Sequence, residues 1–87
     1  MVSQKTTIKN PTGLHLRPAG LFCKTAMRFQ CKITFHAKQT TANAKSILSV
    51  LGACIKADDE IEIVCDGVDE KEALESMIRI IEDGLGE

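Results

Sequence analysis

The hydrophobic period changes within residues 16–38, LRPAGLFCKTAMRFQCKITFHAK. Over residues 16–29 apolar side chains recur every three or four positions, which is typical of an amphipathic helix. Pro18 suits the first turn of such a helix, because proline there removes no intrahelical hydrogen bond. From residue 31 onward apolar and polar side chains alternate, which is typical of a half-buried strand. These residues therefore predict a helix followed by a strand, each with one apolar face.

The segments on either side show the same two periods. The sequence predicts strands over residues 2–9, 31–38, 40–43 and 60–66, and helices over residues 16–29, 46–53 and 70–83. Asp69 and Glu72 resemble a capping box at the start of the last helix. The order β-α-β-β-α-β-α predicts one α+β domain over residues 1–87. We expect a two-layer open-faced sandwich with three helices on one face of a four-stranded antiparallel sheet.

The charges are divided unequally along the chain. The net charge is −1, yet residues 1–56 hold nine Lys or Arg and no acidic residue, whereas residues 57–87 hold all twelve Asp and Glu. A folded domain with this division attracts oppositely charged partners. The aromatic residues are only three Phe, which leaves none to stack on bases. An acidic protein surface is therefore the expected partner, and nucleic acid is not.

Cysteine spacing and hydropathy exclude several classes of protein. The four Cys form no C-x-x-C pair, and no His lies at metal-ligand spacing from one, so no metal or cofactor is expected and all four are predicted to be small buried side chains. The longest nearly apolar run, residues 47–55, is much shorter than the about 20 residues of a membrane span. The first residues lack the apolar region of a signal peptide. The sequence thus predicts a cytoplasmic protein that does not insert into membranes.

His15 lies in the loop just before the first predicted helix, two positions from Arg17. The free amide groups and the positive dipole end at a helix start favour a bound anion such as phosphate. The same field disfavours the protonated imidazole, so the ring is expected to be neutral and nucleophilic. Pro18 has no amide hydrogen, so Leu16 and Arg17 would supply the backbone donors. The planar Arg17 guanidinium also matches phosphate oxygens.

A loop histidine beside an arginine is also common on ordinary solvated surface. No carboxylate lies near His15 in the sequence to orient its ring, and no adjacent Ser or Cys could use it as a general base. If His15 has chemistry, its simplest role is covalent, with the imidazole itself carrying a phosphoryl group. The residues alone leave phosphate chemistry and plain surface as alternatives.

Two motifs resemble those of a known family. Residues 13–19, GLHLRPA, resemble the active-site signature Gly-x-His-x-Arg-Pro-Ala of the phosphocarrier HPr family of the bacterial sugar phosphotransferase system. Residues 43–47, NAKSI, resemble the regulatory serine site of that family. Chain length, element order and both motif positions agree, so the resemblance covers essentially the whole chain.

The resemblance implies a stoichiometric phosphoryl carrier and not a turnover enzyme. Such carriers accept phosphate from Enzyme I on the histidine matching His15, at Nδ1, and pass it to the IIA domains of sugar-specific permeases. The arginine matching Arg17 stabilises the phosphoryl group in both exchanges. In many low-GC Gram-positive bacteria a dedicated serine kinase/phosphorylase acts on the serine matching Ser46, which slows transfer and creates a corepressor for a catabolite-control regulator. A shuttle of this kind is expected to be a monomer.

The resemblance also implies that the first two helices form the surface for donor and acceptor proteins. Ser46 is a favoured N-cap residue, so a purely structural role explains it equally well. Leu48 lies away from the predicted inward side of the second helix, and an apolar residue beside a basic rim is typical of a transient protein contact, although single exposed leucines are common. The expected contact residues lie on these two helices and are Gly20, Lys24, Met27, Ser46, Ile47, Leu48 and Leu51. A place in the core suits Met27 equally well, and Ile47 and Leu51 are also expected to turn inward with Val50.

A few positions depart from the family pattern. Leu16 and Gly20 stand where Ala or Thr is common, and Cys54 and Asp58 stand where Gly is usual. Because a Cys adopts a left-handed cap only at a cost, the second helix is predicted to end earlier, at Gly52.

Two other functions remain as alternatives. One is a nitrogen-branch or purely regulatory paralogue of HPr, although the regulatory type lacks the histidine that matches His15. The other, more remote, is a metal-binding or ligand-binding domain with the same βαββαβ order, against which the absence of clustered ligands argues.

Overall fold

The computed structural model describes residues 1–86, and its elements follow the predicted order. They are β1 (Val2–Thr7), α1 (Leu16–Ala26), β2 (Lys32–Ala37), β3 (Thr40–Asn43), α2 (Ile47–Gly52), β4 (Glu60–Asp66) and α3 (Glu70–Glu82). The largest difference from prediction is that α1 ends three residues early, at Ala26. Of the helices within residues 1–86, none combines the length and the apolar composition that a membrane span requires.

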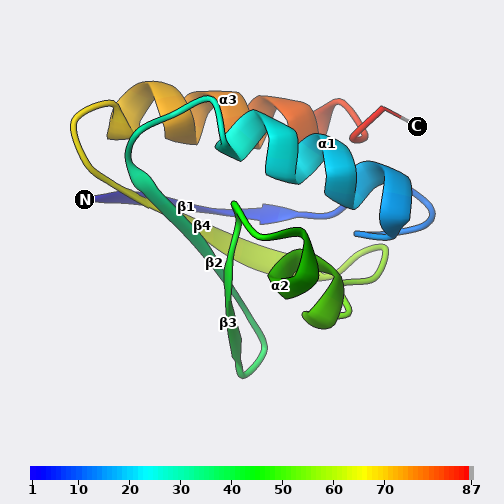
Figure 1. Cartoon of the computed structure of the whole chain (residues 1–87). Helices are drawn as coiled ribbons and strands as arrows, with labels where there is room; N and C mark the ends of the chain where they lie inside the picture. The colour runs from blue at the N-terminus through cyan, green and yellow to red at the C-terminus, as the bar shows by residue number, and fades with distance from the viewer. Residues whose placement is uncertain (87) are drawn as a thin grey trace.

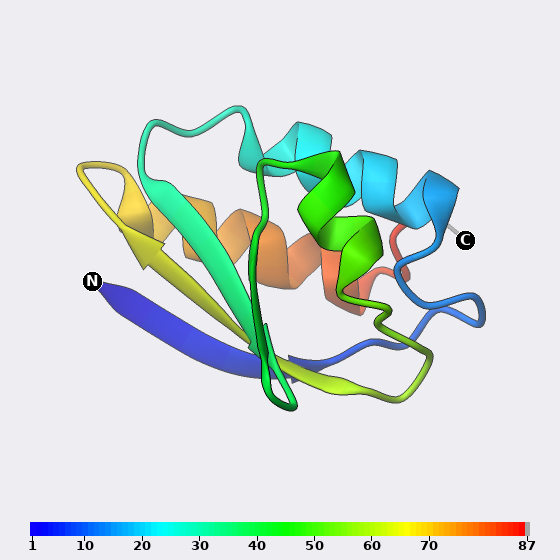
Figure 2. The same ribbon diagram turned by 60° about the horizontal axis from the view of Figure 1, so that its bottom comes forward.

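The four strands form one antiparallel sheet in the order β1-β4-β2-β3. β4 lies between two neighbours, so that Ile63 pairs with Gln4 on one side and with Phe35 on the other. The three helices cover one face of the sheet (Figure 1), and in a view turned by 60° the strands cross in front of α3 (Figure 2). The predicted two-layer α+β architecture is confirmed, and the opposite face of the sheet is open.

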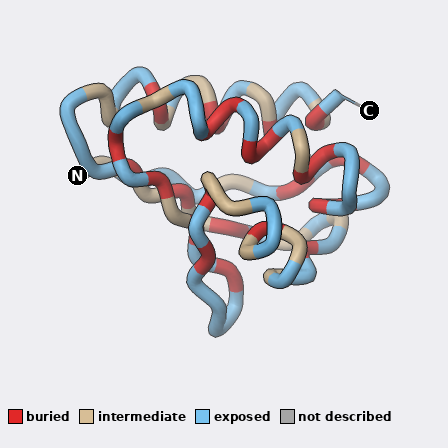
Figure 3. Tube along the Cα trace, viewed as in Figure 1, coloured by how far each residue is buried: buried red, intermediate tan, exposed pale blue. Residues whose placement is uncertain are grey.

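The core lies between the sheet and the helices. Alternate residues of β2 and β4, including Ile33 and Ile63, are fully buried. Phe22 of α1 meets Phe35 of β2 edge-on, with ring centroids 5.3 Å apart and an interplanar angle of 79°. Buried positions recur along α1 and α3 on the side toward the sheet (Figure 3). This packing places the start of α1, where His15 lies, at one end of the sandwich.

Three of the four cysteines behave as the sequence predicts. Cys23, Cys31 and Cys65 are buried, and burial raises the pKa of Cys65 to about 12, so that its thiol stays protonated. Cys54 is exposed, which contradicts the prediction that all four are core residues. It follows α2 in a left-handed conformation, with φ +54°, which directs this short connection along the surface.

The predicted capping box at the start of α3 is wrong. Asp69 occupies the N-cap position, but its side chain makes no capping hydrogen bond. Its carboxylate instead accepts hydrogen bonds from the backbone amides of Gln30 (2.8 Å) and Cys31 (2.9 Å), in the segment that leads into β2. The carboxylate binds these amides and not those of its own helix because two donors from the Gln30–Cys31 segment converge on it. Their hydrogen bonds lower the pKa of Asp69.

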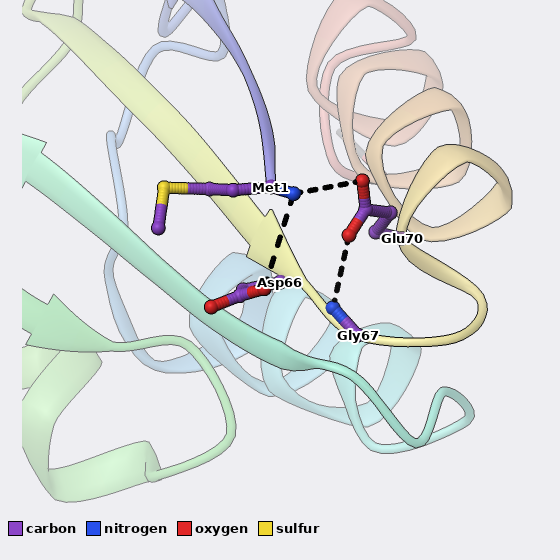
Figure 4. A network of polar contacts seen from close by, with 4 residues as sticks. All are labelled: Met1, Asp66, Gly67 and Glu70. Carbon is purple, nitrogen blue, oxygen red and sulfur yellow. Dashed lines mark hydrogen bonds and ion pairs between the residues drawn. The ribbon is translucent and has the colours of Figure 1, made fainter.

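The neighbouring residue Glu70 joins three parts of the chain at the same end of the molecule (Figure 4). Its Oε1 accepts a hydrogen bond from the Gly67 amide (3.1 Å), and its Oε2 accepts one from the Met1 amino group (3.0 Å). Asp66 lies 3.9 Å from the same amino group. The hydrogen bond from Gly67 and then the one from the Met1 amino group lower the pKa of Glu70, and the bond from Met1 fastens the start of β1 to the start of α3.

Replacing Asp69 by alanine is expected to lower stability at neutral pH, because the Gln30 and Cys31 amides lose their acceptor. A carboxyl group whose pKa is lowered by folding stabilises the protein above its unfolded-state pKa, and this contribution disappears as the pH falls through the folded-state value. The difference in urea midpoint between wild type and Asp69→Ala should therefore be full at pH 7 and shrink below the ordinary aspartate pKa of 3.8.

Glu72→Ala is the matched control for this prediction, since it removes a side-chain acceptor from the first turn of the same helix without removing an acceptor for the Gln30 and Cys31 amides. A larger loss of stability in Glu72→Ala than in Asp69→Ala would restore the capping-box interpretation.

Candidate functional site

His15 is the N-cap residue of α1, as the sequence predicts. Its backbone is extended, with φ −86° and ψ −176°, and its carbonyl oxygen accepts the first helical hydrogen bond, from the Ala19 amide at 2.8 Å. Its side chain makes no capping hydrogen bond and is exposed. The imidazole is therefore held at the helix start by its backbone alone, and the ring is accessible to a partner.

The first turn of α1 presents its donors beside this ring. Leu16 and Arg17 are the first two helical residues, and amides at these positions have no acceptor within a helix. Pro18, the third residue, is buried and has no amide hydrogen. The Arg17 side chain is exposed. Two amide donors and one guanidinium thus lie next to His15 in the chain, which suits a doubly charged oxyanion.

The loop before His15 is packed tightly against the segment that follows α2. Asn10 is buried, and its side-chain amide donates to the Gly13 carbonyl oxygen at 2.7 Å. The Leu14 amide donates to the Ile55 carbonyl oxygen at 3.0 Å. Gly13 has φ +66°, and a Cβ atom there would lie 2.5 Å from that same carbonyl oxygen. Only glycine permits so close an approach, so Gly13 sets the distance between the two segments.

A surface hollow of about 250 Å³ borders His15. It is lined by Thr12, Leu14, His15, Leu51, Cys54, Ile55 and Lys56. Of the predicted contact residues, only Leu51 lies in it. The sequence did not point to Cys54 and Lys56, because about forty positions separate them from His15 in the chain, and it gave no reason to single out Thr12, which lies three positions before His15. The family resemblance marked the Cys54 position as unusual, but nothing in the sequence placed it beside His15.

The other predicted contact residues lie on α1 and α2 or at the ends of these helices. Met27 is 65% exposed and Leu48 is 80% exposed, in agreement with a contact surface. Ile47, predicted to turn inward, is 37% exposed; within α2 Val50 is buried, and Leu51 packs against the core while partly exposed. Lys24 is exposed, whereas Gly20 and Leu51 are half-buried. The Leu16 side chain, which is not among the predicted contact residues, is 68% exposed and extends this apolar surface toward His15.

Ser46 is the N-cap residue of α2. Its hydroxyl oxygen accepts a hydrogen bond from the Ser49 amide at 3.3 Å, so the structural role is present. The Nζ of neighbouring Lys45 donates to the Phe29 carbonyl oxygen at 2.6 Å, which ties the start of α2 to the segment after α1. Ser46 precedes the first residue of α2, whereas Leu51, near the other end of the helix, lines the hollow beside His15.

The family assignment comes from the whole chain. The family model described as the PTS HPr component phosphorylation site matches residues 2–83. The chain belongs to the HPr family. The HPr-like protein Crh of Halalkalibacterium halodurans is 38% identical over 82 residues, which cover 94% of this chain and 98% of that protein. The phosphocarrier protein HPr of Treponema pallidum is 34% identical over 87 residues, which cover 100% of this chain and 99% of that protein.

Solved structures of HPr proteins share the fold of this HPr-family chain. HPr-C-His from Thermoanaerobacter tengcongensis has a TM-score of 0.97 at 36% identity, covering 100% of this chain and 98% of that chain. A structure of an HPr dimer from the same organism has a TM-score of 0.80 at 36% identity, covering 100% of both chains. The existence of this dimer leaves the expectation of a monomer without support.

Proposed function

We propose that this HPr-family protein is a phosphoryl carrier, which accepts phosphate from Enzyme I on His15 and passes it to the IIA domains of sugar-specific permeases in the cytoplasm. The observation that carries the proposal is the exposed imidazole at the start of α1, beside amides without helical acceptors. In the first transfer a His15 ring nitrogen forms a bond to phosphorus as the bond from phosphorus to Enzyme I breaks. In the second transfer the nucleophile of the IIA domain forms a bond to phosphorus as the bond to His15 breaks, which regenerates the free imidazole.

Arg17 is proposed to stabilise the phosphoryl group. Its guanidinium is always charged and has a planar set of donors, which match the oxygens of a phosphoryl group. The Leu16 and Arg17 amides are proposed to donate hydrogen bonds to the same oxygens at the helix start. The guanidinium and the two amides belong to exposed residues. A carrier that meets one partner after another requires such exposure.

A regulatory function is the second candidate, because the chain is similar to the HPr-like protein Crh. His15 favours the carrier, since the regulatory type of HPr paralogue lacks the matching histidine. A carrier that is also regulated through Ser46, by a serine kinase and a catabolite-control regulator, accounts both for the presence of His15 and for the similarity to Crh. The nitrogen branch of the phosphotransferase system would use the same site with different partners.

Phosphorylation by purified partners tests the proposed carrier function. The protein is incubated with phosphoenolpyruvate and Enzyme I, and the bound phosphate is mapped by peptide fragmentation. The expected product carries an acid-labile, base-stable phosphate on His15 and loses it when a IIA domain is added. Phosphate on a serine alone, or no phosphate, would contradict the carrier function.

Replacing Ser46 by aspartate is expected to slow phosphate acceptance several-fold. Aspartate keeps the N-cap but places a negative charge on the proposed docking surface, where acidic partners are expected to bind. Single-turnover transfer from phosphorylated Enzyme I measures this rate. Ser46→Asn is the matched control, because asparagine also caps the helix and has no charge. Equal rates for Ser46→Asp and wild type would contradict regulation through this position.

A further inference from the structure

Lys56 lies in the same surface hollow as His15 although 41 positions separate them in the chain. It belongs to the segment between α2 and β4, on the side of the hollow away from α1. The Leu14 amide donates a hydrogen bond to the Ile55 carbonyl oxygen. Gly13 packs against the Lys56 backbone so closely that a Cβ atom on residue 13 would lie 2.7 Å from the Lys56 Cα. The position of Lys56 relative to the His15 loop is therefore fixed by close backbone contact.

The Asp59 carboxylate, which contacts the Lys56 backbone, is engaged by other groups. The Asp59 Oδ2 accepts a hydrogen bond from the Lys56 backbone amide at 2.9 Å and lies 3.8 Å from the Lys38 Nζ. The Asp58 side chain is exposed. Within residues 1–86, the Lys56 ammonium forms no ion pair with any carboxylate. Its charge is consequently available to an anion that enters the hollow.

The hollow itself favours an anion. Its described lining includes no Asp or Glu, and three of its residues, Leu14, Leu51 and Ile55, are aliphatic. Apolar walls reduce the screening by water and strengthen the attraction between a cation and an anion. A volume of about 250 Å³ exceeds the size of a phosphoryl group and leaves room for its hydration.

We propose that Lys56 is a second cationic contact for the phosphoryl group on His15. This inference rests on the proposed carrier function and adds a residue to it. Arg17 approaches the phosphoryl group from the first turn of α1, and Lys56 approaches it from the segment after α2. Two cations from different elements match the charge of close to −2 on the group, which a single arginine does not neutralise.

The titration of the phosphoryl group provides a direct test. A nearby cation favours the doubly ionised phosphoryl group, so removing the Lys56 charge should raise its second pKa. The ³¹P resonance of phosphohistidine, followed from pH 5 to pH 8, reports this midpoint. A unit charge about 7 Å away in water shifts a pKa by about 0.4 units, so Lys56→Gln is expected to raise the midpoint by about that amount.

Two variants control this measurement. Lys56→Arg keeps the charge and should keep the wild-type midpoint. Lys32→Gln removes one lysine charge at the opposite end of the sheet, where Lys32 pairs across the strands with Asp66, and should also leave the midpoint unchanged. An unchanged midpoint in Lys56→Gln would overturn the proposal. If, in addition, the transfer rates of Lys56→Gln became less sensitive to salt than those of the wild type, Lys56 would act on the partner protein and not on the phosphoryl group.

Failure of this inference is distinguishable from failure of the carrier function. If Enzyme I does not phosphorylate the wild type, the carrier function fails. The same titration can still be carried out on protein phosphorylated with phosphoramidate, in a His36→Gln background so that the signal comes from His15. If Enzyme I phosphorylates His15 and the Lys56→Gln midpoint does not move, only the role of Lys56 fails.

Discussion

Replacing His15 by alanine is expected to abolish phosphorylation by Enzyme I completely. The proposed acceptor is the imidazole nitrogen itself, and no neighbouring side chain within residues 12–18 offers another nitrogen nucleophile of this kind. The substitution should leave the fold intact, because the His15 side chain is exposed and makes no capping hydrogen bond. Incorporation of labelled phosphate from phosphoenolpyruvate measures the loss, and circular dichroism verifies folding.

His36→Ala is the matched control for the His15 substitution. His36 is the other histidine of the chain, exposed on the open face of the sheet, with its Nδ1 2.7 Å from the Thr41 hydroxyl oxygen. It lies on β2 and not at a helix start, so its removal should leave phosphate incorporation at the wild-type level. Phosphate that remains on His15→Ala, or disappears from His36→Ala, would place the acceptor elsewhere.

Replacing Gly13 by alanine is expected to lower both stability and the rate of phosphate acceptance. Its φ of +66° is unfavourable for alanine, and the added Cβ would lie 2.5 Å from the Ile55 carbonyl oxygen and 2.7 Å from the Lys56 Cα. Left-handed strain costs of order 1–3 kcal/mol, and the clash adds to it, so we expect a loss of about 2 kcal/mol or more in the free energy of unfolding. Because the two segments must separate, the hollow beside His15 should also be deformed. Urea unfolding and single-turnover transfer measure the two effects.

Substitutions at two other glycines distinguish the effect on stability from the effect on the transfer rate. Gly20→Ala lies within α1 with open space around its Cα, so it should raise stability by about 0.5–1 kcal/mol. Gly67→Ala combines φ +154° with a Cβ 2.7 Å from the Cys31 Cα, at the end of the sheet away from His15. It should lose stability but, while folded, transfer at the wild-type rate. Equal transfer rates for Gly13→Ala and Gly67→Ala would show that Gly13 does not position the site.

The sequence was sufficient to predict the elements because local interactions specify them. Alternation in β2 and β4 and the three-to-four spacing in α1 and α3 match one-sided burial in the structure. The N-cap position of Ser46 follows from a hydroxyl that reaches an amide three residues away. Lys38 shows where local preference is overridden: the β2–β3 turn contains no Gly, Asn or Asp, and Lys38 takes φ +55° because strand pairing on both sides holds the turn closed.

The sequence by itself determined the order of the elements, the family, and the position of His15 at a helix start. The tertiary structure alone decided that Asp69 binds the Gln30 and Cys31 amides, that Cys54 is exposed, and that Lys56 shares a hollow with His15. The physical reason is range. Periodicity and capping act over a few residues, whereas these contacts join segments about forty residues apart and form only when the helices pack onto the sheet.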